Sequence, residues 1–208
     1  HPLSEAKTLD NDQVYKKYNF NASKNYLAIL PGSRASEISN MMETYINFME
    51  IGLVNNPNFH FLIPAADNLI KEKIESYIKN KDLPITIAIG SAREFLSISK
   101  YSIVTSGTAT LEAAVLEAAP IICYKTSKFN YFIISRMLKT KLIGLPNLLL
   151  SKKIFPELLQ SECTPENIYK SLQSLINSND IHIELHKVKS HLEGQGFDAA
   201  AKAISKTT

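Results

Sequence analysis

The sequence predicts an α/β protein with a Rossmann-like parallel sheet flanked by helices. Short apolar runs alternate with longer stretches whose apolar residues recur at helical spacing, which is typical of parallel strands joined by crossover helices. The length of 208 residues also suits a single core. We expect a linker and a leading helix over residues 1–24, then one Rossmann-like domain with a C-terminal helical tail over residues 25–208.

The predicted strands are short apolar runs that end at turn-forming residues. The first run, NYLAIL, stops at Pro31 and Gly32, and the fourth, YSIVT, stops at Ser106 and Gly107. The five predicted strands span residues 25–30, 60–63, 85–89, 101–105 and 121–124.

A predicted helix follows each of the first four strands. The longest can open at Ser36 and Glu37, carries apolar residues at helical spacing to about residue 53, and ends before Asn55 and Pro57. The other three are expected over residues 69–79, 92–99 and 108–117.

The alternation stops after the fifth strand. A helix that mixes aromatic, aliphatic and basic residues is expected over residues 130–138. The next segment, IGLPNLLLSKKIFPELLQ, contains two prolines and is expected to be a long loop. The tail is predicted to be helical over residues 165–177, 181–192 and 198–204.

Composition excludes several classes of protein. With 45% hydrophobic and 21% charged residues the chain is ordinary for a globular protein, and no run approaches the roughly 18 apolar residues of a membrane span. The first residues lack the pattern of a secretory signal, so a cytoplasmic location is expected. Two cysteines and five scattered histidines support neither a disulfide framework, a metal site nor a hydrolytic triad.

Positive charge is concentrated in one part of the chain. The net charge is +3, yet no acidic residue lies between Glu117 and Glu157, where seven Lys and Arg residues occur. Such a segment can meet phosphate, an anionic membrane or nucleic acid, or be a solvated face without a partner.

Two predicted turns carry residues suited to an anion. In an open parallel sheet the ligand lies beyond the carboxyl ends of the strands. Small residues after the fourth strand let backbone N–H groups approach a diphosphate, and the Arg34 guanidinium after the first strand can pair with it. The alternatives are a surface ion pair between Arg34 and Glu37, and a capped helix with Glu112 as a solvated acid.

Two further polar residues stand beside prolines. Asn147 follows Pro146, and Glu157 follows Pro156. Either could face the same crevice, but Asn147 could equally form an Asx turn and Glu157 cap a helix.

Three segments together resemble the lipid-A-disaccharide synthases: LPGSRASEI, TSGTATLEAA and LPNLLLSKKIFPELLQ, in this order. The resemblance extends over essentially the whole chain. It implies the C-terminal domain of a GT-B glycosyltransferase, in which two Rossmann-like domains face each other across a cleft and this one holds the UDP-sugar.

The resemblance also implies a reaction. The enzyme would transfer 2,3-diacylglucosamine from UDP-2,3-diacylglucosamine to 2,3-diacylglucosamine 1-phosphate and release UDP, without a metal or another cofactor. Arg34 and Asn147 would be catalytic. The expected donor-site residues are Gly32, Ser33, Arg34, Ser106, Gly107, Thr108, Thr110, Glu112, Asn147 and Glu157. The general base would belong to the N-terminal domain, which this sequence lacks, so little turnover is expected from this chain alone.

The resemblance implies a function for the basic segment between Glu117 and Glu157. Its cations and aromatic residues would rest on an anionic membrane, at the inner face of the inner membrane of a Gram-negative bacterium, although core packing explains the apolar side equally well. The candidate residues are Lys128, Phe129, Phe132, Arg136 and Lys139.

Nucleic acid is not an expected partner. The rival hypotheses are another GT-B enzyme that uses UDP-N-acetylglucosamine, and a non-catalytic nucleotide-binding or interaction module from a split gene.

Overall fold

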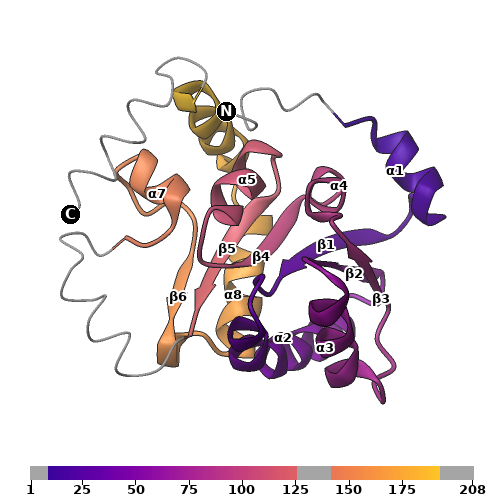
Figure 1. Ribbon diagram of the computed structural model, residues 1–208. Helices are drawn as coiled ribbons and strands as arrows, with labels where there is room; N and C mark the ends of the chain where they lie inside the picture. Colours follow the sequence, from indigo (N-terminus) through magenta and orange to yellow (C-terminus); the bar gives the residue numbers. More distant parts are fainter. Residues whose placement is uncertain (1–8, 126–141, 193–208) are drawn as a thin grey trace.

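The computed structural model describes residues 9–125 and 142–192. A parallel six-stranded sheet in the order β3-β2-β1-β4-β5-β6 forms its centre, with helices on both faces (Figure 1). This confirms the predicted α/β fold. The strands are β1 (Asn25–Leu30), β2 (Phe59–Ala65), β3 (Ile85–Ile89), β4 (Tyr101–Thr105), β5 (Ala119–Tyr124) and β6 (Glu157–Leu159).

The described helices alternate with the strands along the chain. They are α1 (Asn11–Tyr18), α2 (Ala35–Asn55), α3 (Asn68–Ile78), α4 (Ala92–Ser97), α5 (Ala109–Val115), α7 (Leu145–Leu149) and α8 (Pro165–Ile176), with a 3-10 turn η1 (Gln160–Glu162). Residues 181–192 are also helical. Side chains cap several helices in the way that their sequences favour: Asp67 accepts from the Ile70 N–H at 2.8 Å at the head of α3.

The central strands β1, β2, β4 and β5 are largely buried on both faces, which explains why their sequences are mostly apolar. On β1, Leu27 and Ile29 belong to the core that α2 and α8 cover, whereas Ala28 and Leu30 pack towards α4 and α5. The register places Leu27 opposite Phe61 of β2 on one side and Tyr101 of β4 on the other. The strands therefore end close together at one edge.

An aromatic cluster attaches α1 to this sheet. The rings of Tyr18 and Phe95 lie 5.1 Å apart, and those of Phe20 and Tyr26 lie 4.8 Å apart. Glu94 accepts hydrogen bonds from the Lys17 ammonium at 2.7 Å and the Tyr18 hydroxyl at 2.6 Å. Burial raises the pKa of Glu94, but these two hydrogen bonds outweigh it and hold the pKa below its usual value. The helix α1 lies in the segment for which a linker and leading helix were expected.

The described part beyond β5 differs from the sequence prediction. The segment expected to be a long loop contains the helix α7 and the strand β6, which pairs with β5 through Ile122 and Glu157. The prediction of a loop was wrong because β6 has only three residues and is positioned by buried side-chain contacts, not by an apolar run. The expected helices over residues 130–138 and 198–204 lie outside the described residues.

Both cysteines of the chain are buried and free. Cys123 lies on β5, and Cys163 precedes α8. Burial raises the pKa of Cys123, whereas the interaction with the Cys123 thiol lowers the pKa of Cys163. No three metal-binding side chains gather within residues 9–125 and 142–192, and no helix there has the length and hydrophobicity to cross a bilayer.

Candidate functional site

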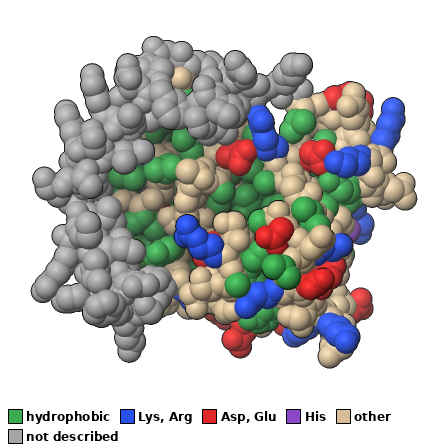
Figure 2. Space-filling model, in the orientation of Figure 1, with side chains coloured by type: hydrophobic (Ala, Val, Ile, Leu, Met, Phe, Trp, Pro, Cys, Tyr) green, Lys and Arg blue, Asp and Glu red, His purple; other side chains and the backbone are tan. Residues whose placement is uncertain are grey.

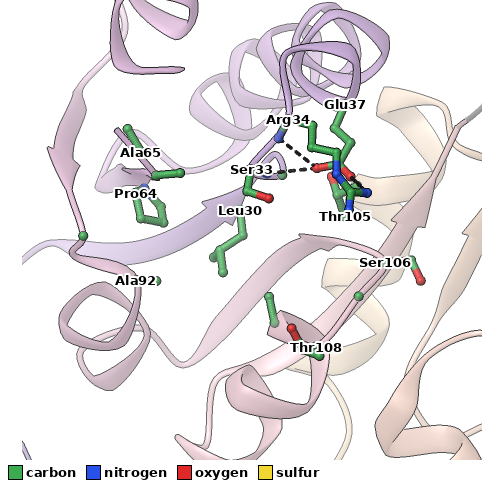
Figure 3. Close-up of a pocket in the computed structure, with 15 residues that line it drawn as sticks. Leu30, Ser33, Arg34, Glu37, Pro64, Ala65, Ala92, Thr105, Ser106 and Thr108 are labelled. Atoms are coloured by element: carbon green, nitrogen blue, oxygen red, sulfur yellow. Dashed lines mark hydrogen bonds and ion pairs between the residues drawn. The ribbon is translucent and has the colours of Figure 1, made fainter. Parts of the chain in front are cut away.

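A pocket of about 500 Å³ opens at the carboxyl edge of the sheet, where β1 and β4 lie side by side although they are far apart in the sequence. The chain reverses its direction of strand addition between these two strands, and such a point is where open α/β sheets bind ligands. Figure 3 shows the turns after β1 and β4 facing each other across this pocket. The sequence-predicted residues that line it are Gly32, Ser33, Arg34, Ser106, Gly107 and Thr108.

The turn after β1 is shaped by Glu37, which lies in the first turn of α2. Its carboxylate oxygen Oε2 accepts hydrogen bonds from the backbone N–H groups of Ser33 at 2.9 Å and Arg34 at 3.2 Å. Its Oε1 lies 3.4 Å from Nη1 of Arg34, so the predicted alternative of an Arg34–Glu37 ion pair is observed. The Arg34 side chain is nevertheless 80% exposed, so its guanidinium is available to a ligand.

Gly32 allows Glu37 to fold over this turn. Its φ is +112°, and a Cβ there would lie 2.7 Å from Cβ of Glu37. We expect Gly32→Ala to lower the free energy of unfolding by about 2 kcal/mol, because it adds backbone strain to a steric overlap. Gly90→Ala is the matched control: its φ is +67° but no atom lies within 4 Å of the added Cβ, so about 1 kcal/mol is expected. Urea unfolding of the two variants measures the difference, and equal losses would contradict the steric argument.

Hydrogen bonds to neighbouring elements support the turn after β4. The Thr105 hydroxyl lies 2.9 Å from the buried Tyr45 hydroxyl, and the Ser106 N–H donates to the Cys123 carbonyl at 2.9 Å. The Thr110 hydroxyl donates to the Gly107 carbonyl at 2.8 Å, so buried Thr110 supports the turn without lining the pocket. A Cβ on Gly107 would meet no atom within 4 Å, so the pocket is open at this position.

Glu112 lies on α5 beside the pocket, not in its lining. Its Oε1 is 3.6 Å from Nε of Arg93, the residue that follows the pocket-lining Ala92 on α4. Burial raises the pKa of Glu112, and the charge of Arg93 partly opposes this. A contact of Glu112 with the donor, which the resemblance implies, would therefore involve a carboxylate that already has a cationic partner.

Asn147 and Glu157 lie inside the protein and not in this pocket. The Asn147 amide donates to the Phe155 carbonyl and to Glu157 Oε1, both at 2.8 Å, and accepts from the N–H groups of Ile154 and Phe155 at 2.9 Å. Both amide hydrogens and both lone pairs are thus used. Glu157 also accepts from the N–H groups of Ile143 at 3.0 Å and Gly144 at 2.9 Å. These contacts support a structural role, and the catalytic or donor-binding role implied by the resemblance stays a prediction.

The apolar side of the pocket was not predicted from the sequence. Pro64, Ala65 and Ala66 follow or end β2, and Gly90 and Ala92 follow β3. The available signal was their position, since the ends of all parallel strands meet at the same edge. The pocket thus has a polar half from β1 and β4 and an apolar half from β2 and β3.

The charged groups among the described residues that line the pocket are two single side chains, Arg34 and Glu37. On the face seen in Figure 2, acidic and basic residues are interspersed over the part of the chain that is described. The membrane candidates Lys128, Phe129, Phe132, Arg136 and Lys139 lie outside the described residues.

Comparison with known proteins decides the family. A model of the lipid-A-disaccharide synthetases matches residues 1–206. The chain belongs to this family. A lipid-A-disaccharide synthase of Saccharophagus degradans is 33% identical over 213 residues, covering 95% of this chain and 55% of the relative. One from Wigglesworthia glossinidia brevipalpis is 36% identical over 193 residues, covering 90% of this chain and 50% of the relative. The chain therefore spans about half the length of these lipid-A-disaccharide synthases.

Solved structures share the fold of this lipid-A-disaccharide synthetase family member. WaaG, a glycosyltransferase involved in lipopolysaccharide biosynthesis, has a TM-score of 0.58 at 11% identity, with 99% of this chain and 53% of WaaG covered. The C-terminal CMP-Kdo binding domain of WaaA from Acinetobacter baumannii has a TM-score of 0.56 at 10% identity, with 88% of this chain and 96% of that domain covered. At these identities the likeness establishes the fold alone.

Proposed function

We propose that this chain is the donor-binding half of a lipid-A-disaccharide synthase and that its pocket holds the diphosphate of UDP-2,3-diacylglucosamine. One observation carries the proposal: the turns after β1 and β4, which contain two of the family-like motifs, line one pocket. Arg34 provides a cation there, and the turns provide backbone N–H groups.

The diphosphate is also where charge develops during glycosyl transfer. The hydroxyl of 2,3-diacylglucosamine 1-phosphate attacks C1 of the donor sugar, the bond from C1 to the diphosphate oxygen breaks, and UDP leaves with the electron pair. Arg34 would stabilise this leaving group, because donors aimed at developing negative charge lower the barrier. The proton of the attacking hydroxyl would go to a base in the other half of the enzyme.

The remaining pocket residues suit the nucleoside. Pro64, Ala65 and Ala66 form an apolar wall against which a flat base can pack. Glu112 would bind the ribose hydroxyls, with Arg93 keeping the carboxylate in place from the neighbouring helix. Asn147 and Glu157 would contribute by fixing the chain around β6.

Isothermal titration calorimetry of the chain with UDP and uridine tests the proposal. We expect saturable binding of one UDP per chain with a dissociation constant below about 1 mM, and at least tenfold weaker binding of uridine, since charge-assisted hydrogen bonds to the diphosphate provide most of the affinity. Absence of binding at several millimolar UDP would contradict a donor site and favour the rival hypothesis of an interaction module.

A further inference from the structure

Glu37 provides the one acidic side chain among the described residues that line the pocket, and Arg34 provides the one basic side chain. Figure 3 shows their interaction at the mouth of the turn after β1. The Glu37 carboxylate accepts from the backbone N–H groups of Ser33 at 2.9 Å and Arg34 at 3.2 Å, and lies 3.4 Å from the Arg34 guanidinium. It therefore occupies the donors that an anionic ligand would use.

A phosphate group and the Glu37 carboxylate would compete for these donors. Both are anions, and like charges a few ångströms apart repel strongly where water is partly excluded. Each backbone N–H group also provides a single hydrogen. A diphosphate that approaches Ser33 and Arg34 must consequently displace the carboxylate or lose these contacts.

We propose that Glu37 is an internal competitor for the diphosphate: it holds the Arg34 guanidinium and the two N–H groups when the pocket is empty and leaves them when the ligand binds. This inference rests on the proposed function and concerns the regulation of the same site. It makes Glu37 a residue that determines affinity and charge selectivity, because a ligand with more negative charge displaces the carboxylate more readily.

The local structure permits this exchange. The side chain of Glu37 is 27% exposed, so the carboxylate can move towards solvent. Its ion pair with Arg34 is long and lies at the surface, where such pairs contribute little. The helix α2 spans 21 residues and is anchored further along by buried side chains, including Ile38, Met41 and Met42. Release of Glu37 thus leaves the helix in place and removes only contacts at its first turn.

Competition by Glu37 would also affect the release of UDP after the reaction. After transfer, the pocket holds UDP, whose diphosphate occupies the same donors as the diphosphate of the substrate. When UDP begins to dissociate, Glu37 can reoccupy the Ser33 and Arg34 donors, which favours its departure. An enzyme that binds its product less tightly is limited less by product release.

The test is titration of Glu37→Gln with uridine, UMP, UDP and inorganic pyrophosphate. Glutamine keeps an acceptor oxygen for the backbone N–H groups but removes the charge. We expect UDP and pyrophosphate to bind about tenfold more tightly than to the unmodified chain, UMP to gain less, and uridine to remain unchanged. The gain should shrink as salt is raised from about 50 mM to 500 mM, because screening weakens the repulsion.

Glu43→Gln is the matched control, because it removes the same charge from an exposed position of the same helix outside the pocket lining. An equal gain from Glu43→Gln would overturn the inference, since the effect would then be one of net charge. Unchanged or weaker UDP binding by Glu37→Gln would also overturn it and identify Glu37 as a cap or a ligand contact. Glu37→Ala, which loses the acceptor too, should melt at a lower temperature yet still bind UDP more tightly. If the unmodified chain binds UDP and Glu37→Gln binds it no more tightly, the proposed competition by Glu37 is wrong but the proposed donor site is supported. If neither protein binds UDP, both proposals are wrong.

Discussion

Replacing Arg34 with alanine is expected to weaken UDP binding by about 30-fold. A hydrogen bond between charged groups contributes roughly 1.5–3 kcal/mol, and the guanidinium can present two parallel donors to a phosphate. The fold should not change, because the Arg34 side chain is 80% exposed and its ion pair with Glu37 is long. Calorimetry measures the loss of affinity, and urea unfolding should show a change below about 0.5 kcal/mol in the free energy of unfolding.

Two further variants sharpen this prediction. Arg34→Lys keeps the charge without the planar fork, so we expect an intermediate loss of about fivefold. Lys81→Ala removes a cation that pairs with Glu50 and precedes β3, at the opposite edge of the sheet, and should leave the affinity unchanged. Full UDP affinity in Arg34→Ala would show that the diphosphate does not bind at the turn after β1.

The second large effect concerns stability. Asn147→Ala is expected to lower the free energy of unfolding by about 3 kcal/mol, because it leaves the buried N–H of Phe155 and the partly buried N–H of Ile154 without an acceptor and removes a donor from Glu157. Urea unfolding followed by circular dichroism measures it. The loss should appear without any ligand present.

Asn55→Ala provides the comparison for this variant. The Asn55 amide donates to the Ile51 carbonyl on an exposed part of α2, so its removal should cost less than about 0.5 kcal/mol. Equal stability of Asn147→Ala and the unmodified chain would show that the contacts around β6 are not needed for folding. A loss of activity in an Asn147 variant must therefore be separated from a loss of folded protein before it is attributed to catalysis.

The sheet and the convergence of two turns were predictable from the sequence. β1, β3 and β4 have the predicted bounds, because each is a short, largely apolar run flanked by residues that end a strand. Parallel strands then place their carboxyl ends at one edge, so Arg34 and Gly107 had to lie on the same side of the sheet. The ion pair of Arg34 with Glu37 also follows from spacing, since residues three apart on a helix are neighbours.

The rest depends on contacts between distant segments. In the sequence, Asn147 is a polar residue beside a proline. This pattern fits a buried structural amide as well as a site residue. The hydrogen bonds of Asn147 to Phe155 and Glu157, which support the structural role, could not be predicted from the sequence. The pairing of Glu112 with Arg93 likewise joins α5 to α4, and no sequence spacing indicates it.

The buried thiols have a practical consequence for measuring these effects. Cys123 and Cys163 are the chain's entire complement of cysteine, and both are inaccessible to a bulky reagent while the protein is folded. A maleimide dye would therefore attach selectively to one cysteine engineered on the surface, for instance at Val54, which is 84% exposed. Such a conjugate would need no prior removal of native cysteines, and its slow additional labelling would report how often the interior opens.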